Sequence, residues 1–158
     1  MPLTTSRNPL RFLLFVGLAA GAFSAAPVLA QSSKPIQSQD TNVSGVVAEL
    51  IECKREEGVL TVRVLYRNTT DKMVKVKLVP GKNYDAYYVT AGSKKYLMMR
   101  DPQKKTLSAY TRGNMTVNLD KDGRFQWWAK YPAPSADVKK ITYYTPLTAP
   151  FDNVPISD

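Results

Sequence analysis

The fold is decided by residues 59–68, whose sequence is Val59-Leu60-Thr61-Val62-Arg63-Val64-Leu65-Tyr66-Arg67-Asn68. Apolar side chains occupy every second position from Leu60 to Tyr66, while polar side chains fill most of the positions between them. Successive side chains of a β-strand point to opposite faces of its sheet. This alternation therefore predicts a strand with one buried and one exposed face.

Shorter stretches with a similar alternation lie on both sides of this one. Residues 54–58 and 120–123 are rich in charge and end in Gly, which predicts hairpin turns. No window of a dozen residues shows a helical stripe. Further strands are expected at residues 46–53, 73–79, 84–91, 94–100, 115–119, 124–131 and 138–145, followed by an extended but irregular tail over residues 146–158.

About eight short strands without crossover helices predict an all-β, antiparallel sandwich or barrel. We favour the sandwich, because the strands have one apolar and one polar face, as two packed sheets require. The domain is expected to occupy residues 43–158. The apolar faces of two strands are expected in its core, and they comprise Leu60, Val62, Val64, Tyr66, Phe125 and Trp127.

The first thirty residues have the features of a cleavable signal peptide. Arg7 and Arg11 give a basic start, an apolar stretch follows, and Val28-Leu29-Ala30 has the small-residue pattern that signal peptidase accepts. We expect cleavage before Gln31, export to the periplasm or the outside of the cell, and no transmembrane segment afterwards. The apolar stretch is shorter than the roughly 20 residues that span a bilayer; an uncleaved membrane anchor is the alternative. Residues 31–42 are polar and predict a flexible linker.

Charge and cysteine content narrow the classes of partner and chemistry. The chain carries a formal net charge of +9, to which Arg7 and Arg11 contribute two, so the part after the leader carries +7. This charge favours contact with anionic surfaces such as lipid head groups or acidic glycans, although scattered lysines also serve solubility. Cys53 is the only cysteine. It is expected to be a small buried apolar residue, with pairing to another molecule as the alternative.

The chain lacks the side chains that several kinds of catalytic site require. The chain has no His, which excludes Ser-His-Asp and Cys-His systems and removes the usual ligand of zinc and copper sites. The glycines show no nucleotide-binding spacing, and residues 120–123 lack the further oxygen ligands of a calcium loop. No cofactor and no metal are expected. An enzyme that uses only Asp, Glu, Tyr and Lys is an alternative.

Aromatic and basic residues interleave on the predicted strands, above all in residues 82–96, 124–131 and 140–144. Aromatic rings flanked by cations stack on sugars or bases and attract phosphate or carboxylate. The same residues also suit half-buried strands and protect outer strands from aggregation. Trp128 has the opposite parity to Phe125 and Trp127, so it is expected to be exposed. The candidate ligand-binding residues are Arg124, Trp128, Lys130, Lys140 and Tyr144.

The sequence also resembles a known group of proteins. The resemblance is carried by Ala86-Tyr87-Tyr88-Val89, by residues 127–134 and 150–156, and upstream by residues 58–62 and 66–70. These stretches are similar to small exported bacterial domains of unknown function that adopt an immunoglobulin-like β-sandwich. The resemblance covers nearly all of residues 43–156 and implies a fold, without catalytic or ligand residues to carry over. The cysteine pair of antibody domains is absent, since Cys53 stands alone.

We therefore expect a non-enzymatic, exported immunoglobulin-like β-sandwich that acts as a binding or structural accessory in the bacterial envelope. Its partner is expected to be a protein or an anionic envelope polymer and not a specific nucleic acid, while its oligomeric state stays open. The alternative is a recognition module for an anionic polymer such as an acidic glycan, a cell-wall component or lipid head groups. Clustering of Trp128, Lys130 and Tyr144 on one surface favours that alternative, and their dispersal favours the accessory.

Overall fold

The computed structural model describes residues 34–110 and 113–158, so the predicted signal peptide over residues 1–30 and the start of the predicted linker lie outside the described residues. The expectation of an all-β, antiparallel protein is confirmed for these residues. Their regular strand pairs are antiparallel, and their helix is confined to two 3-10 turns, η1 (Pro80–Lys82) and η2 (Tyr84–Ala86). The described strands are β1 (Gln37–Asp40), β2 (Val46–Glu56), β3 (Val59–Asn68), β4 (Val74–Val79), β5 (Tyr88–Ala91), β6 (Lys94–Leu97), β7 (Met115–Leu119), β8 (Arg124–Pro132), β9 (Lys140–Tyr144) and β10 (Phe151–Pro155).

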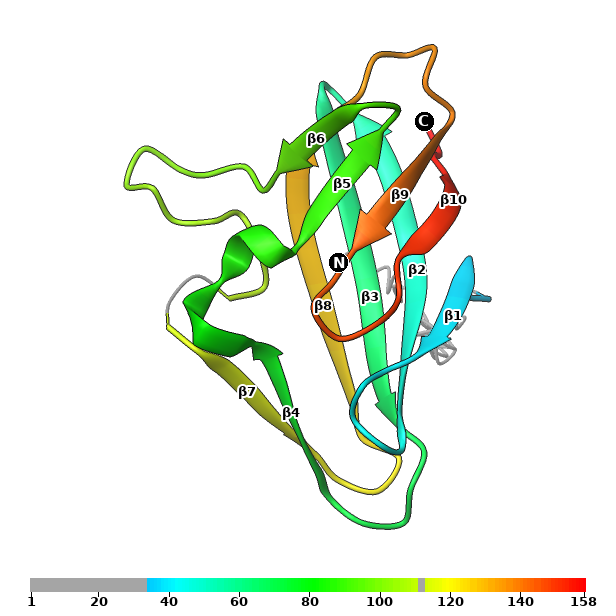
Figure 1. The fold of residues 1–158 in the computed structure, drawn as a ribbon, viewed down its shortest axis with the longest axis vertical. Coiled ribbons are helices and arrows are strands. Elements are labelled where there is room, and N and C mark those ends of the chain that lie inside the picture. The colour runs from blue at the N-terminus through cyan, green and yellow to red at the C-terminus, as the bar shows by residue number, and fades with distance from the viewer. Residues whose placement is uncertain (1–33, 111–112) are drawn as a thin grey trace, which may run out of the picture. The chain divides into compact units, whose positions relative to one another are not determined.

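The strands form three sheets (Figure 1). The first sheet has the order β1-β2-β3-β8, the second sheet has the order β10-β9-β5-β6, and β4 and β7 pair as a two-stranded ribbon. A tight turn at Glu57 and Gly58 connects β2 to β3, and both residues have positive φ angles, of 48° and 77°. This turn fixes the register in which Glu56 faces Val59 and Cys53 faces Val62.

Side chains of the two larger sheets meet in one hydrophobic core. Tyr87, which precedes β5, stacks on Trp127 of β8 with ring centroids 4.4 Å apart. Tyr131 of β8 meets Tyr143 of β9 edge to face at 6.2 Å. Leu60, Val62, Val64, Tyr66 and Trp127 are fully buried, as predicted. Phe125 is half-buried and packs against this core near the start of β8.

The predicted linker is wrong for its described part, because Gln37–Asp40 forms the edge strand β1 and pairs with β2. Its polar side chains also bind the other sheet: the Gln37 side-chain amide donates to the carbonyl of Asp152 at 2.6 Å, and the Gln39 amide donates to that of Pro150 at 3.1 Å. The tail, expected to be irregular, contains the strand β10, to which Asp152 belongs and which Pro150 precedes. The ordered domain therefore includes residues before its predicted start at 43.

The predicted hairpin of residues 115–119 and 124–131 is also wrong, since β7 pairs with β4 and β8 pairs with β3. The turn between them is held by Asn68, which is 1 % exposed. The Asn68 side-chain amide donates to the carbonyls of Leu119 at 3.0 Å and Asp120 at 2.9 Å. The Asn68 backbone N–H donates to the carbonyl of Gly123 at 3.0 Å. The turn thus leads the chain from the ribbon to the first sheet.

The strand predicted over residues 84–91 is shorter in the structure. Tyr84 lies in η2, and β5 begins only at Tyr88. After β6 the chain leaves the second sheet and follows the edge of β8. There the Lys130 N–H donates to the carbonyl of Leu107 at 2.9 Å, and the Ala109 N–H donates to that of Trp128 at 2.9 Å. This segment satisfies an edge that would otherwise be open to pairing with another chain.

Candidate functional site

The five candidate residues lie on two faces of the domain. Arg124, Trp128 and Lys130 alternate with the buried residues of β8 and therefore lie on the outer face of the first sheet. Lys140 and Tyr144 lie by the same argument on the outer face of the second sheet. Because the inner faces of the two sheets pack on each other, the outer faces point away from each other. The structure thus separates Tyr144 from Trp128 and Lys130.

Trp128 lies in an open groove of about 580 Å³ on the outer face of the first sheet. The indole is half-buried, whereas the sequence predicted an exposed side chain. Arg63 of β3 lies directly opposite Trp128 in the strand register, and Glu52 of β2 lies opposite Arg63. We call this hollow the Trp128 groove, and it is lined by Glu52, Lys54, Glu56, Thr61, Arg63, Gln126, Trp128 and Lys130.

The Trp128 groove carries charges of both signs. Arg63 pairs with Glu52 at 3.2 Å, and Lys54 pairs with Glu56 at 3.1 Å, so both acids are neutralised by neighbours. Within the part of the chain that the structure describes, Lys130 has no ion-pair partner. The groove therefore offers one uncompensated cation beside an indole ring.

Sequence reasoning found only Trp128 and Lys130 of the residues that line the groove. Arg124 lies on the same face, but opposite Arg67 and outside the lining. The residues of β2 and β3 were missed because their place beside Trp128 depends on the pairing of β3 with β8, which joins segments far apart in the sequence. The parity of Arg63 within its own strand was the available signal for its exposure.

The outer face of the second sheet is occupied by contacts among its own side chains. Tyr144 stacks on Tyr88 of β5 with ring centroids 4.3 Å apart and an interplanar angle of 10°. The ammonium group of Lys95 lies 3.7 Å from the centroid of the Tyr88 ring. Such stacked and cation–π pairs stabilise neighbouring strands. Lys140 lies apart from them, in a separate hollow of about 210 Å³. This face is therefore a weaker candidate for ligand binding.

Cys53 and several tyrosines lie inside the core. Cys53 is 1 % exposed, as expected for a small buried apolar residue. Burial raises the pKa of its thiol to about 12 and keeps it in the weakly nucleophilic protonated form. Burial also raises the pKa of Tyr66 to about 12 and the pKa of Tyr143 above its ordinary value. The hydroxyls of Tyr66, Tyr131 and Tyr143 have no hydrogen-bond partner among the described residues.

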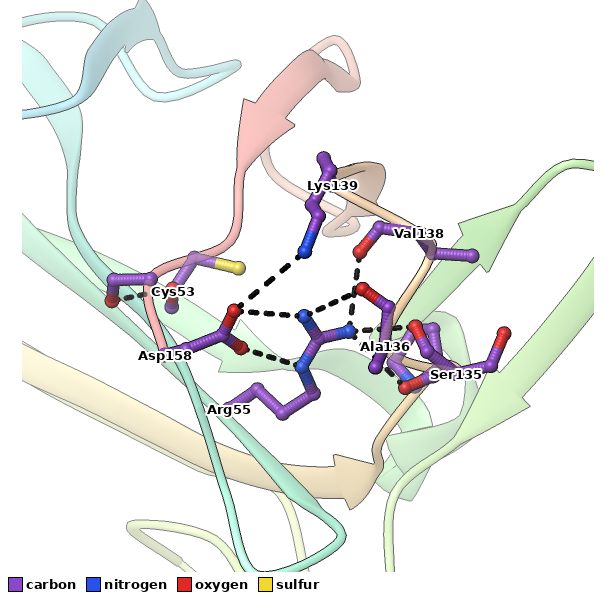
Figure 2. A network of polar contacts seen from close by, with 9 residues as sticks. Cys53, Arg55, Ser135, Ala136, Val138, Lys139 and Asp158 are labelled. Carbon is purple, nitrogen blue, oxygen red and sulfur yellow. Dashed lines mark hydrogen bonds and ion pairs between the residues drawn. The ribbon is translucent and has the colours of Figure 1, made fainter.

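A second polar cluster surrounds Arg55, at the end of β2 (Figure 2). Its guanidinium donates to both carboxylate oxygens of Asp158, at 2.7 and 3.1 Å, and to the carbonyls of Ser135 at 2.7 Å and Val138 at 3.1 Å. The hydrogen bond from Arg55 lowers the pKa of the Asp158 carboxyl. Since the Arg55 side chain is only 10 % exposed and its donors are occupied, this cluster holds residues 135–138 and Asp158 in place.

Within residues 34–110 and 113–158, no group of three or more His, Cys, Asp or Glu side chains is placed to hold a metal ion. In the same ranges, no helix is both long and apolar enough to cross a membrane. Comparison of the chain with family models, curated proteins and solved structures found no match.

Proposed function

We propose that the chain is an exported, non-enzymatic immunoglobulin-like β-sandwich that acts as a binding accessory in the bacterial envelope. The basic and apolar leader with its Val28-Leu29-Ala30 site supports export. Two four-stranded antiparallel sheets with a common core support the sandwich. The dispersal of Trp128 and Tyr144 onto different faces favours an accessory over a single site for an anionic polymer.

The Trp128 groove is the observation that carries the binding role. Its side chains project from three paired strands, so the surface is presented by a rigid scaffold. Tryptophan and arginine are enriched among the residues that dominate binding energy at protein interfaces. Paired charges of both signs suit a partner that also carries both signs, because the ion pairs of Arg63 and Lys54 can exchange partners. A segment of another polypeptide meets this requirement.

Photo-crosslinking in the native envelope tests this proposal. A photoreactive residue at Gln126, which lines the groove, is expected to give a discrete protein adduct. The same residue at Gln103, exposed in the loop after β6, serves as the matched control and is expected to give none. Trp128→Ala in the Gln126 background should abolish the adduct. The same adducts at both positions, or an adduct indifferent to Trp128→Ala, would exclude the groove as the binding surface.

The uncompensated Lys130 beside Trp128 favours the anionic polymer as the second candidate function. Titration with heparin, anionic vesicles and peptidoglycan fragments at low and high salt separates the two. An anionic ligand should bind more weakly at high salt, because exposed charges are screened over about 8–10 Å near physiological ionic strength. Trp128→Ala should weaken such binding, whereas Tyr144→Ala on the other outer face should not. Absence of binding to all three ligands at low salt leaves the protein partner as the proposal.

A further inference from the structure

The ribbon carries a basic groove that is separate from the Trp128 groove. Lys75 and Lys77 alternate along β4 with buried residues, so both lysines lie on one exposed face. Together with Asn42 and an apolar wall that includes Val43, Pro146 and Leu147, they line a hollow of about 370 Å³. This volume lies within the range of sites that bind small molecules. We call this hollow the ribbon groove.

The ribbon groove differs from the Trp128 groove in its charge. Its lining contains two lysines and no acid, and neither lysine forms an ion pair with any residue that the structure describes. Like charges on one face of a strand repel each other, and a bound anion would relieve that repulsion. The ribbon groove therefore selects for negative charge more strictly than the Trp128 groove does.

The apolar wall of the ribbon groove is held by a backbone hydrogen bond between its two loops. The Asn42 N–H donates to the carbonyl of Leu147 at 2.8 Å, which joins the loop before β2 to the loop after β9. Beyond Lys77 and Pro80 a second hollow of about 180 Å³ follows, lined also by Asn114 and Thr116. A preformed site avoids the entropic cost of ordering its loops on binding.

We propose that the ribbon groove binds an amphipathic anion. Its oxyanion head group would lie between Lys75 and Lys77, which offer charge-assisted hydrogen bonds. Its apolar body would lie against the half-buried Val43 and Pro146, with the buried Leu147 behind them, where burial of apolar surface contributes the remaining affinity. The ligand class is that of a single-chain lipid with a phosphate head group. This inference does not depend on the Trp128 groove.

Calorimetric titration of the purified protein at low salt tests the proposal with three probes. Dodecyl phosphate below its micellar concentration carries both features, inorganic phosphate carries the charge alone, and dodecyl maltoside carries the chain alone. Dodecyl phosphate is expected to bind about tenfold or more tightly than either of the others, because each of these lacks one of the two contacts. Equal binding of dodecyl maltoside would overturn the role of the lysines, and equal binding of inorganic phosphate would overturn the role of the apolar wall.

Variants then locate the site. The double variant Lys75→Gln/Lys77→Gln is expected to weaken dodecyl phosphate binding by more than about tenfold, because it removes two charge-assisted hydrogen bonds. Lys104→Gln/Lys121→Gln removes the same net charge from exposed positions elsewhere and should leave binding unchanged. Trp128→Ala should also leave it unchanged, which separates this site from the proposed function. If both double variants weakened binding equally, the effect would come from net charge alone and the proposal would be overturned.

Discussion

The two larger sheets differ in the length of their strands and therefore in how stable each would be without the other. β2, β3 and β8 of the first sheet have 11, 10 and 9 residues, whereas the strands of the second sheet have 4 or 5. Short strands bury little apolar surface by themselves, so the second sheet depends on contacts across the core, such as that of Tyr87 with Trp127. The first sheet is therefore the frame on which the second is assembled.

The largest effect is expected from alkaline pH, which tests whether both sheets unfold as one unit. Cys53 and Tyr66 of the first sheet have pKa values raised by burial from 9.0 and 10.0 to about 12 each. Their neutral forms are favoured by folding, so this contribution is complete below pH 9 and is lost as the pH rises towards 12. Far-ultraviolet circular dichroism, which reports the strands, and near-ultraviolet circular dichroism, which reports the packed aromatic rings between the sheets, should therefore change in one joint transition. Loss of the near-ultraviolet signal before the far-ultraviolet signal would show that the second sheet opens separately.

Trp127→Ala is expected to cost about 3–5 kcal/mol of unfolding free energy, because it removes a large, fully buried side chain and its contact with Tyr87. Denaturant titration measures this. Trp128→Ala is the matched control, one residue along the same strand, and should cost much less because the side chain is half-buried on the outer face. Equal costs would contradict the assignment of the two faces of β8.

Val62→Ala in the frame is expected to cost roughly 1–3 kcal/mol, from lost transfer free energy and the cavity left behind. Val89→Ala removes the same two carbons at an equally buried position in β5 of the second sheet. If the second sheet adapts more easily, its cavity should collapse further and Val89→Ala should cost less. Chemical denaturation of both variants measures the two costs. A Val62→Ala protein with an unchanged free energy of unfolding would contradict the role of the first sheet as the frame.

The smallest effect is expected on the outer face of the second sheet. A double-mutant cycle of Tyr88→Ala and Tyr144→Ala should give a coupling energy of about 0.5–1.5 kcal/mol, as found for stacked aromatic pairs. Lys95→Gln should lower the stability further only while Tyr88 is present, since the cation lies over that ring. A coupling energy of zero would show that the stacked rings do not stabilise the short strands.

The sequence pattern predicted both ends of β3 correctly, because the alternation of apolar and polar side chains in this strand is a property of neighbouring residues. The pattern failed where side chains far apart in the sequence decide the structure. Residues 37–40 contain no apolar side chain. They are held by pairing with β2 and by side-chain amide contacts of Gln37 with Asp152 of β10 and of Gln39 with Pro150 just before it. Asp122-Gly123 is a common hairpin signal, but Asn68 holds that turn so that it connects two different sheets.

The same limit applies to the candidate site. Strand parity placed Trp128 on an outer face and apart from Trp127, but parity does not say which sheet a strand joins. The ribbon groove could not be predicted from the sequence for a related reason. In the sequence, Lys75 and Lys77 have other charged residues and strand residues near them. The apolar wall of the groove comes from residues 43, 146 and 147, which are far away in the chain. Only the packing of β4 beside those loops makes the lysines part of a groove.

The adjacent tryptophans of β8 give this protein two optical reporters separated by one peptide bond. They are its only tryptophans, and the pleat of the strand turns Trp127 into the core and Trp128 towards solvent. A dissolved quencher such as iodide should reach the second indole and spare the first. Trp128→Phe would leave an emission signal that reports on the integrity of the core. Trp127→Phe would leave one that reports on occupancy of the groove, so that folding and binding can be followed separately in the same chain.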